Sequence, residues 1–197
     1  MPPKRRGSHS KIAGLVLTPG MSAGRDHSAL VAIDGALTPT GVRVERVDFP
    51  YRLAGRRAPD QPSVLVATVV EAARSLAETL AVPFEKVALG GRSMGGRMCS
   101  MAVAEGLGAA ALVLVSYPLH PPGQPERRRS EHFGEIAVPC LFVSGTRDVF
   151  CTPEELEGAT AAISGTVTHR WIEDGDHGLR RRDAEVAEIV RDWLTAL

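Results

Sequence analysis

The amino-acid sequence predicts an α/β protein in which a mostly parallel sheet of about six strands carries helices on both faces. Short apolar runs alternate with longer segments of helical periodicity along almost the whole chain, which is typical of parallel strands joined by crossover helices. The runs are apolar at every position rather than at alternate ones, as in residues 111–115, so both faces of the sheet should be covered. Glycine, proline and aspartate mark the turns between the segments.

The first elements follow from apolar runs and turn residues. Residues 12–17 form an apolar run that Thr-Pro-Gly ends, which predicts a buried strand. We expect Asp26 to cap a helix that runs to about Ile33. Residues 42–47 alternate valine with charged side chains, which favours a strand near the edge of the sheet. Residues 48–61 combine prolines with arginines and predict a surface loop.

The rest of the chain continues the alternation. A strongly helical stretch opens with Pro62, which the first turn of a helix tolerates, and extends to about Leu80. Residues 118–135 are rich in proline and arginine without apolar periodicity, so they predict a loop or a rudimentary lid. The other expected elements are strands over 87–89, 111–115, 141–144 and 167–172, and helices over 94–105, from about Pro153, and over 183–194.

Size and composition favour one compact domain. The chain has 197 residues, of which 44% are hydrophobic and 23% charged, the balance of an ordinary globular protein. We expect residues 11–197 to form a single domain and residues 1–10 to be a disordered, basic tail. Since no apolar run reaches the length of a signal sequence or a membrane span, we expect a cytoplasmic protein without a membrane partner.

Charge and cysteine usage argue against several classes of function. The formal net charge is zero, which gives no global field to attract nucleic acid. The three cysteines, Cys99, Cys140 and Cys151, lack C-x-x-C spacing and are odd in number, which argues against a disulfide framework and a zinc site. We therefore expect no metal and no cofactor, and the oligomeric state stays open.

The strongest motif is Gly-Arg-Ser-Met-Gly at residues 91–95. A serine hydroxyl is a poor nucleophile until a base removes its proton, so a nucleophilic serine is presented on an exposed, rigid turn. The G-x-S-x-G elbow provides that turn between a strand and a helix, and its glycines relieve crowding around the serine. A predicted strand precedes this motif and a predicted helix follows it. We therefore expect Ser93 to be a nucleophile rather than part of a plain glycine-rich turn.

Two further residues complete a candidate catalytic triad. Asp148 and His177 each follow the end of a predicted strand. Because the carboxyl ends of parallel strands share one edge of a sheet, both side chains should meet Ser93 there. Serine, then aspartate, then histidine is the chain order of the triad in folds of this type, with the histidine as base and the aspartate as its orienting partner. Asp174 and Asp176 are rival acids, although their closeness to His177 in sequence makes a productive approach awkward.

An acyl-transfer site also needs N–H donors for the developing oxyanion, each worth about 2.7–4 kcal/mol. The residue after the nucleophile, Met94, supplies one of them. The second should come from the turn after the first strand, where Pro19 has no N–H to donate. We expect Met21 to donate, with Ser22 as the next choice, and a plain strand-to-helix turn is the competing interpretation.

Four segments carry a resemblance to a known family: GGRSMGGR at 90–97, DFPYRLAGRR at 48–57, the GTRD turn that ends at Asp148, and the DGDHG turn around His177. Together they resemble a subfamily of small α/β-hydrolases that is related to dienelactone hydrolases and to a hydrolase-like subunit of a chromatin-acetylating complex. The similarity extends over nearly the whole chain. It implies an α/β-hydrolase fold and maps the triad of the family onto Ser93, Asp148 and His177. Residues 118–135 are too short for a large cap, so we expect a minimal lid.

Two departures from the family pattern bear on function. The family usually has His-Gly in the turn after the first strand, whereas this chain has Pro19-Gly20, so the oxyanion loop can be shaped differently. Dienelactone hydrolases proper use a cysteine nucleophile, whereas this chain has Ser93, so their substrate does not transfer.

These observations predict a serine hydrolase that cleaves a small ester, thioester or other activated acyl compound through an acyl-enzyme intermediate. Its expected partner is that small-molecule acyl substrate. The alternative function is a catalytically vestigial interaction module of the same fold, because fold identity does not determine activity.

Arginines near the motif are candidates for substrate binding. Arg92 and Arg97 flank the elbow, and Arg52 should lie in a loop at the same edge of the sheet. A guanidinium at the mouth of the site can bind a carboxylate or phosphate, so Arg92 and Arg52 are the candidate substrate-binding residues, with a solvated or structural role as the alternative. Cys151 lies just past Asp148, where a packing role competes with that of a second nucleophile.

Overall fold

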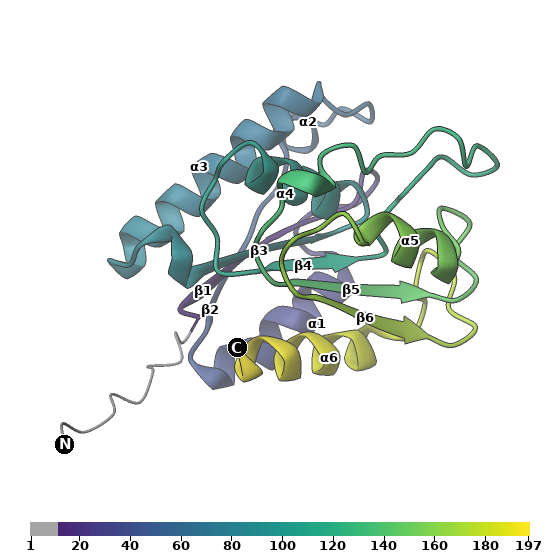
Figure 1. Ribbon diagram of the computed structural model, residues 1–197. Helices are drawn as coiled ribbons and strands as arrows, with labels where there is room; N and C mark the ends of the chain where they lie inside the picture. Colours follow the sequence, from purple (N-terminus) through teal and green to yellow (C-terminus); the bar gives the residue numbers. More distant parts are fainter. Residues whose placement is uncertain (1–11) are drawn as a thin grey trace, which may run out of the picture.

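The computed structural model describes residues 12–197, so the tail predicted over residues 1–10 lies outside the described residues. A six-stranded sheet runs through the centre in the order β2-β1-β3-β4-β5-β6, and every neighbouring pair is parallel (Figure 1). Its strands are β1 (Gly14–Thr18), β2 (Arg43–Arg46), β3 (Val87–Arg92), β4 (Leu112–Val115), β5 (Cys140–Gly145) and β6 (Val167–Ile172). The predicted parallel sheet is confirmed, and β2 lies at its edge.

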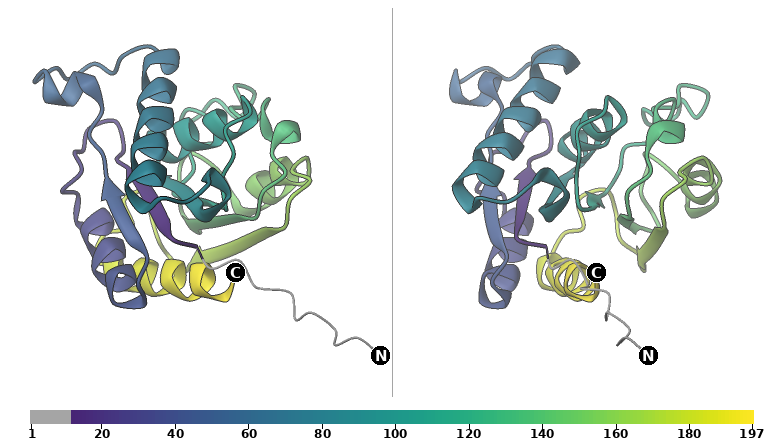
Figure 2. Two further views of the ribbon diagram at one scale, coloured as in Figure 1. Left: turned by 90° about the vertical axis from the view of Figure 1, so that its left-hand side faces the viewer. Right: turned by 60° about the vertical axis from the view of Figure 1, so that its left-hand side comes forward.

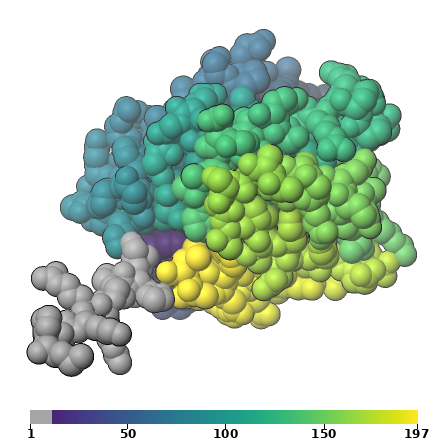
Figure 3. Space-filling model, viewed as in Figure 1, coloured from purple at the N-terminus to yellow at the C-terminus, as the bar shows by residue number. Residues whose placement is uncertain are grey.

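Helices cover both faces of the sheet. They are α1 (Ser28–Leu37), α2 (Pro50–Leu53), α3 (Pro62–Leu80), α4 (Met94–Ala104), α5 (Pro153–Thr160) and α6 (Asp183–Ala196), with short 3-10 turns at Thr38–Thr40, Phe84–Lys86 and Phe133–Glu135. Helices α1 and α6 pack together beneath the sheet in the view of Figure 1, and α3, α4 and α5 lie on the opposite face (Figure 2). Helix α6 also forms part of the outer surface (yellow, Figure 3). None of the helices within residues 12–197 is both long and apolar enough to cross a membrane.

The apolar runs become strands because both of their faces are buried. All residues of β1, β4 and β5 are buried, and so is β3 as far as Gly91. Their side chains alternate between two core clusters, one under α3, α4 and α5 and one under α1 and α6. A strand that contributes to two cores has no solvent-facing positions for polar residues, which is why these segments are apolar throughout.

The start of the first helix differs from the expectation. Helix α1 begins after His27, whose ring Nδ1 accepts a hydrogen bond from Ala29 N at 3.2 Å. Asp26 was expected in that capping position, but its carboxylate pairs with Arg46 on β2 at 2.9 Å. An arginine that is distant in the sequence therefore competes successfully for the side chain that would otherwise cap the helix.

The segment predicted as a surface loop over residues 48–61 contains the short helix α2. Two aromatic side chains of this segment, Phe49 and Tyr51, are fully buried, and their rings stack with centroids 6.3 Å apart. Pro50 occupies the first position of the helix, where its missing N–H costs nothing. The expectation was wrong for residues 50–53, because burial of two aromatic rings outweighs the polar composition around them, whereas residues 54–61 lack helix and strand as predicted.

The order of the strands reverses at β1, which lies between β2 and β3. The connection after β1 leads to α1 on one face, and the connection after β3 leads to α4 on the other. In open α/β sheets such a switch point leaves a crevice beyond the carboxyl ends of the strands, where ligands bind. Ser93, directly after β3, lies at this crevice.

Candidate active site

Ser93 lies at the sharp turn between β3 and α4, where the motif predicts it. Its φ of 52° is in the left-handed region, which non-glycine residues seldom occupy and which stores local strain. The backbone is held on both sides, since Ser93 N donates to Val115 O at 2.8 Å and Ser93 O accepts from Arg97 N at 3.1 Å. The turn therefore presents the hydroxyl of Ser93 beyond the carboxyl edge of the sheet.

Ser93, His177 and Asp148 form a continuous chain of hydrogen bonds. Ser93 Oγ lies 2.9 Å from His177 Nε2, and His177 Nδ1 lies 2.8 and 3.0 Å from the two carboxylate oxygens of Asp148. Because the carboxylate accepts, Nδ1 carries the proton and Nε2 presents its lone pair to the serine hydroxyl. This arrangement allows the imidazole to take the proton of Ser93.

The surroundings fix the positions of the acid and the base. The side chain of Asp148 has no solvent exposure, and its Oδ1 also accepts from Phe150 N at 2.9 Å. The Phe150 ring packs against the imidazole of His177, with centroids 4.1 Å apart. Arg92 Nη2 donates to the carbonyl oxygen of His177 at 2.7 Å and so anchors its backbone. Phe150 belongs to no sequence motif, and its only signal is its position two residues after the candidate acid.

The two rival acids lie elsewhere. Asp174 pairs with Arg147 at 2.6 Å, and both side chains are largely exposed. Asp176 is exposed as well. Of the three candidates, only Asp148 is bonded to the imidazole of His177.

The turn after β1 lies beside the elbow, where the oxyanion donors were expected. A Cβ atom at Gly20 would lie 3.5 Å from the Cβ atom of Ser93. Neither Met21 N nor Met94 N donates to an acceptor within residues 12–197, so both N–H groups are available to a ligand. Tyr51 Oη donates to Met21 O at 2.5 Å and holds this turn in place. Tyr51 is thus a positioning residue that the loop interpretation of its segment concealed.

A cavity of about 330 Å³ opens next to Ser93. Apolar side chains form much of its wall, and they are those of Met21, Leu65, Met94, Met98 and Phe150. Three charged residues also line it, namely Asp60, Arg97 and Arg129. Arg92 and Arg52 are not among the residues that line this cavity. Substrate contacts by these two arginines therefore remain predictions.

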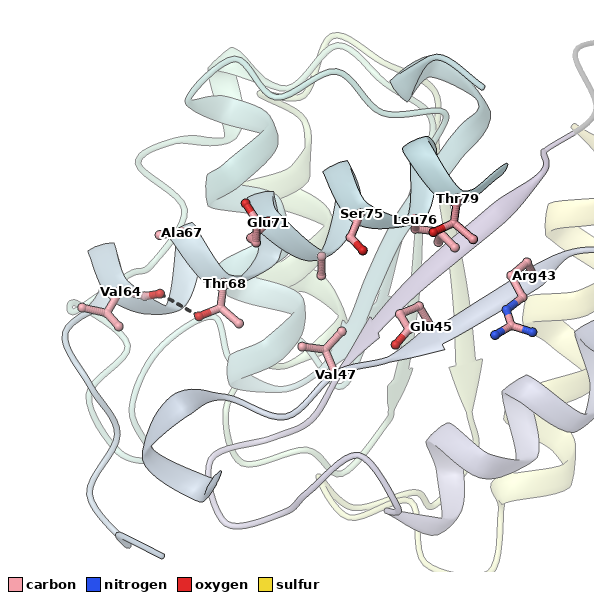
Figure 4. A pocket seen from close by; sticks show the side chains of 11 residues that line it. Arg43, Glu45, Val47, Val64, Ala67, Thr68, Glu71, Ser75, Leu76 and Thr79 are labelled. Atoms are coloured by element: carbon pink, nitrogen blue, oxygen red, sulfur yellow. Dashed lines mark hydrogen bonds between the residues drawn. The ribbon is translucent and has the colours of Figure 1, made fainter. Parts of the chain in front are cut away.

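A larger hollow, of about 720 Å³, lies outside this site, between α3 and the edge strand β2 (Figure 4). Arg43, Glu45 and Val47 form its floor, and Glu71 and Ser75 of α3 are among the residues on its other side. Its lining lacks the histidine that a serine nucleophile would need, whereas the smaller cavity is lined by Ser93, which contacts His177.

The three cysteines are buried, and none of them has the lowered pKa of a nucleophilic thiol. Burial raises the pKa of Cys151 to about 12, with Asp148 and Glu155 adding to the shift, so its thiol stays protonated and packs as a small apolar group. Burial likewise raises the pKa of Cys99 and of Cys140 to about 12. Within residues 12–197, no group of three or more His, Cys, Asp or Glu side chains is arranged to hold a metal ion.

Comparison with known proteins identifies the family. A model of the alpha/beta hydrolase domain matches residues 11–195. The chain belongs to the alpha/beta hydrolases. The hydrolase is similar in structure to an alpha-beta serine hydrolase homologue from Coxiella burnetii, with a TM-score of 0.77 and 18% identity over 95% of this chain and 88% of that one.

Two further solved structures share the fold of this hydrolase. The dienelactone hydrolase from Anabaena variabilis matches with a TM-score of 0.75 and 18% identity, over 95% of this chain and 88% of that chain. Est1E from Butyrivibrio proteoclasticus matches with a TM-score of 0.73 and 15% identity, over 96% and 89%. Identities this low show the fold of the hydrolase alone. The resemblance to a chromatin-complex subunit stays a prediction.

Proposed function

We propose that the protein is a serine hydrolase in which Ser93 is the nucleophile, His177 the general base and Asp148 the carboxylate that orients the base. The supporting observation is the hydrogen-bond chain from Ser93 Oγ through the imidazole to a carboxylate without solvent exposure. The proposed substrate is a small ester, thioester or other activated acyl compound, which suits a cavity of about 330 Å³.

The proposed reaction has two halves. As Ser93 Oγ attacks the acyl carbon, His177 Nε2 takes its proton, and the new oxyanion accepts hydrogen bonds from the N–H groups of Met94 and Met21. The intermediate collapses to an acyl-enzyme, and His177 gives the proton to the leaving group. Water then attacks the acyl-enzyme with His177 again as base, which releases the carboxylic acid and restores Ser93. Asp148 stays ionised and favours the charged imidazole that forms in each half.

Covalent labelling tests the nucleophile directly. A fluorophosphonate probe should label the wild type at Ser93 and should fail to label Ser93→Ala. Hydrolysis of 4-nitrophenyl butyrate should fall by roughly 10³-fold or more in the same variant, because the attacking group is gone. Mass spectrometry of the labelled peptide identifies the modified residue.

Ser100 provides a matched control, since its Oγ also lies 2.8 Å from a histidine nitrogen, His132 Nε2. The Ser100 hydroxyl is buried and donates to Arg97 O at 2.8 Å, so its proton is already engaged. Ser100→Ala should therefore be labelled like the wild type. A wild type that is neither labelled nor active on any short ester would refute the proposal and favour the vestigial interaction module.

A further inference from the structure

Two arginines lie inside the cavity beside Ser93. Arg97 is on α4, one turn after the nucleophile, where a residue four positions along the helix faces the same side. Arg129 comes from the segment 118–135, which was predicted as a loop or lid. The same cavity is therefore lined by two arginines and by Ser93.

Neither guanidinium has an acidic partner. Within the part of the chain that the structure describes, no carboxylate lies within 4.0 Å of Arg97 or Arg129. Arg97 Nε is buried and donates no hydrogen bond to the described residues. Asp60 lines the same cavity, but Arg56 binds its carboxylate at 2.7 Å. Both arginines are half-buried, and the Arg129 guanidinium reaches a backbone partner, Pro118 O, only at 3.5 Å. A partly desolvated guanidinium without a carboxylate partner is stabilised by an anionic ligand.

The backbone of Arg129 is anchored beside the cavity, although burial and a second positive charge disfavour its guanidinium there. Arg129 N donates to Leu119 O at 2.8 Å, and Tyr117 Oη donates to Arg129 O at 2.7 Å, so both backbone groups of the residue are anchored. Burial, followed by the positive charge of Arg97, lowers the pKa of the Arg129 guanidinium. The two cations thus repel each other in a partly desolvated place, and an anion between them would relieve both penalties.

We propose that Arg97 and Arg129 form a binding site for an anionic group, a carboxylate or a phosphate, carried by the acyl substrate of Ser93. Guanidinium groups bind such anions through paired N–H donors, which gives orientation as well as affinity. The inference rests on the proposed hydrolase function and specifies its substrate class. The anion lies a few bonds from the scissile carbonyl, because Arg97 and Ser93 are one helical turn apart.

Matched esters test the site. The first pair is 4-nitrophenyl adipate, whose acyl chain ends in a carboxylate, and its methyl ester, in which that charge is masked. The second pair, 4-acetoxybenzoate and its methyl ester, places the charge on the leaving group instead. The measured quantity is the ratio of kcat/KM for the anionic ester to kcat/KM for the neutral ester, because the ratio cancels effects common to both substrates.

The wild type should prefer the anionic member of at least one pair, and the pair that shows the preference tells which side of the ester carries the anion. Arg97→Gln and Arg129→Gln should each lower that ratio by roughly 10- to 100-fold, the effect of losing hydrogen bonds to a charged group. Arg128→Gln removes the same charge from the next residue, which is exposed and outside the cavity, and should leave the ratio unchanged.

Calorimetric titration with glutarate and with inorganic phosphate separates failure of this inference from failure of the proposed function. The wild type should bind at least one of the two anions, and each Gln variant should bind it roughly 10- to 100-fold more weakly, whether or not the protein hydrolyses esters. If ester hydrolysis survives in Ser93→Ala, the proposed function falls while the titration still decides the anion site. A wild type that binds neither anion, or Gln variants with unchanged ratios in both ester pairs, would overturn the inference.

Discussion

Asp148 differs from the other carboxylates of the site in having no exposure and three hydrogen-bond contacts, two to His177 Nδ1 and one to Phe150 N. In Asp148→Asn, an amide that offers its NH₂ group to Nδ1 would move the ring proton to Nε2. The imidazole could then no longer accept the proton of Ser93. The side chain keeps its size, so packing around it should be retained.

We therefore expect Asp148→Asn to lower kcat on short 4-nitrophenyl esters by a factor on the order of 10⁴, with an unchanged melting temperature. Asp174→Asn is the control, because Asp174 is exposed and pairs with Arg147 rather than with the imidazole. Steady-state kinetics and thermal unfolding of the two variants provide the measurement. Equal activity of Asp148→Asn and wild type would remove Asp148 from the mechanism.

The imidazole of His132 has a lowered pKa and is neutral in the folded protein at ordinary pH. Burial, and then the positive charge of Arg97, lowers its pKa from 6.5 to about 4. The Ser100 hydroxyl already donates to Arg97 O, so His132 Nε2 acts as donor to Ser100. In the unfolded chain the same ring has its ordinary pKa of 6.5.

This difference predicts how stability depends on pH. Above pH 6.5 the ring is neutral in both states, whereas between pH 6.5 and about 4 the unfolded state alone binds the proton, so the free energy of unfolding falls. In His132→Gln this contribution is missing, so its decline over that window should be shallower than that of the wild type. Urea unfolding at a series of pH values measures both slopes. Curves of equal slope for the two proteins would contradict the lowered pKa of the half-buried His132.

Helix α4 and the turn after β1 meet at Gly95. A Cβ atom there would lie 2.5 Å from Thr18 O and 2.6 Å from Pro19 O, closer than such atoms approach in proteins. Both contacts are to backbone, so the added methyl group could be accommodated only if the turn moved. That turn also carries Met21, the proposed oxyanion donor.

Gly95→Ala should lower the free energy of unfolding by about 1–3 kcal/mol, as overpacked substitutions do, and should also reduce kcat through the displaced turn. The control is Gly35→Ala within α1, where a Cβ atom would have no neighbour within 4 Å. That change should raise the free energy of unfolding by about 0.5–1 kcal/mol and leave activity unchanged, because alanine favours helix more than glycine does. If denaturant titrations show no decrease in the free energy of unfolding of Gly95→Ala, the turn after β1 can move without cost and the prediction is wrong.

The two core clusters lie on opposite faces of the same sheet, and a tryptophan packs against each of them, so its fluorescence can report the unfolding of that cluster. Of the two tryptophans in the sequence, Trp171 packs against the cluster under α3, α4 and α5, and Trp193 against the cluster under α1 and α6. Strands β1, β3, β4, β5 and β6 contribute side chains to both clusters, whereas β2 contributes to the second one alone. The clusters should therefore unfold together, as expected of a single domain.

Single-tryptophan variants, Trp171→Phe and Trp193→Phe, test this expectation, because each leaves one reporter. Their fluorescence transitions in urea should coincide. Leu156→Ala in one cluster and Leu30→Ala in the other, both fully buried, should each cost about 2–5 kcal/mol and shift the signal of either tryptophan equally. Two separated transitions would mean that the faces unfold as independent units.

The sequence sufficed to predict the architecture, because the property that makes β4 and β5 strands, burial on both faces, is written in their residues as unbroken apolar runs. The proximity of Ser93, Asp148 and His177 could be predicted for a related reason. Each of them follows the end of a strand. Because parallel strands end at the same edge of the sheet, this position in the sequence is enough to place the three residues near one another.

Other features depended on partners that only the folded chain brings together. Arg92 donates to the carbonyl oxygen of His177, a partner 85 positions away in the sequence that no local pattern indicates. Arg129 reaches the cavity from a segment whose composition resembles an ordinary surface loop. Tyr51 supports the turn at Met21 from a helix that was predicted as a loop. Periodicity and motifs describe local preference and burial, whereas the partner of a polar side chain is decided by which distant segments pack beside it.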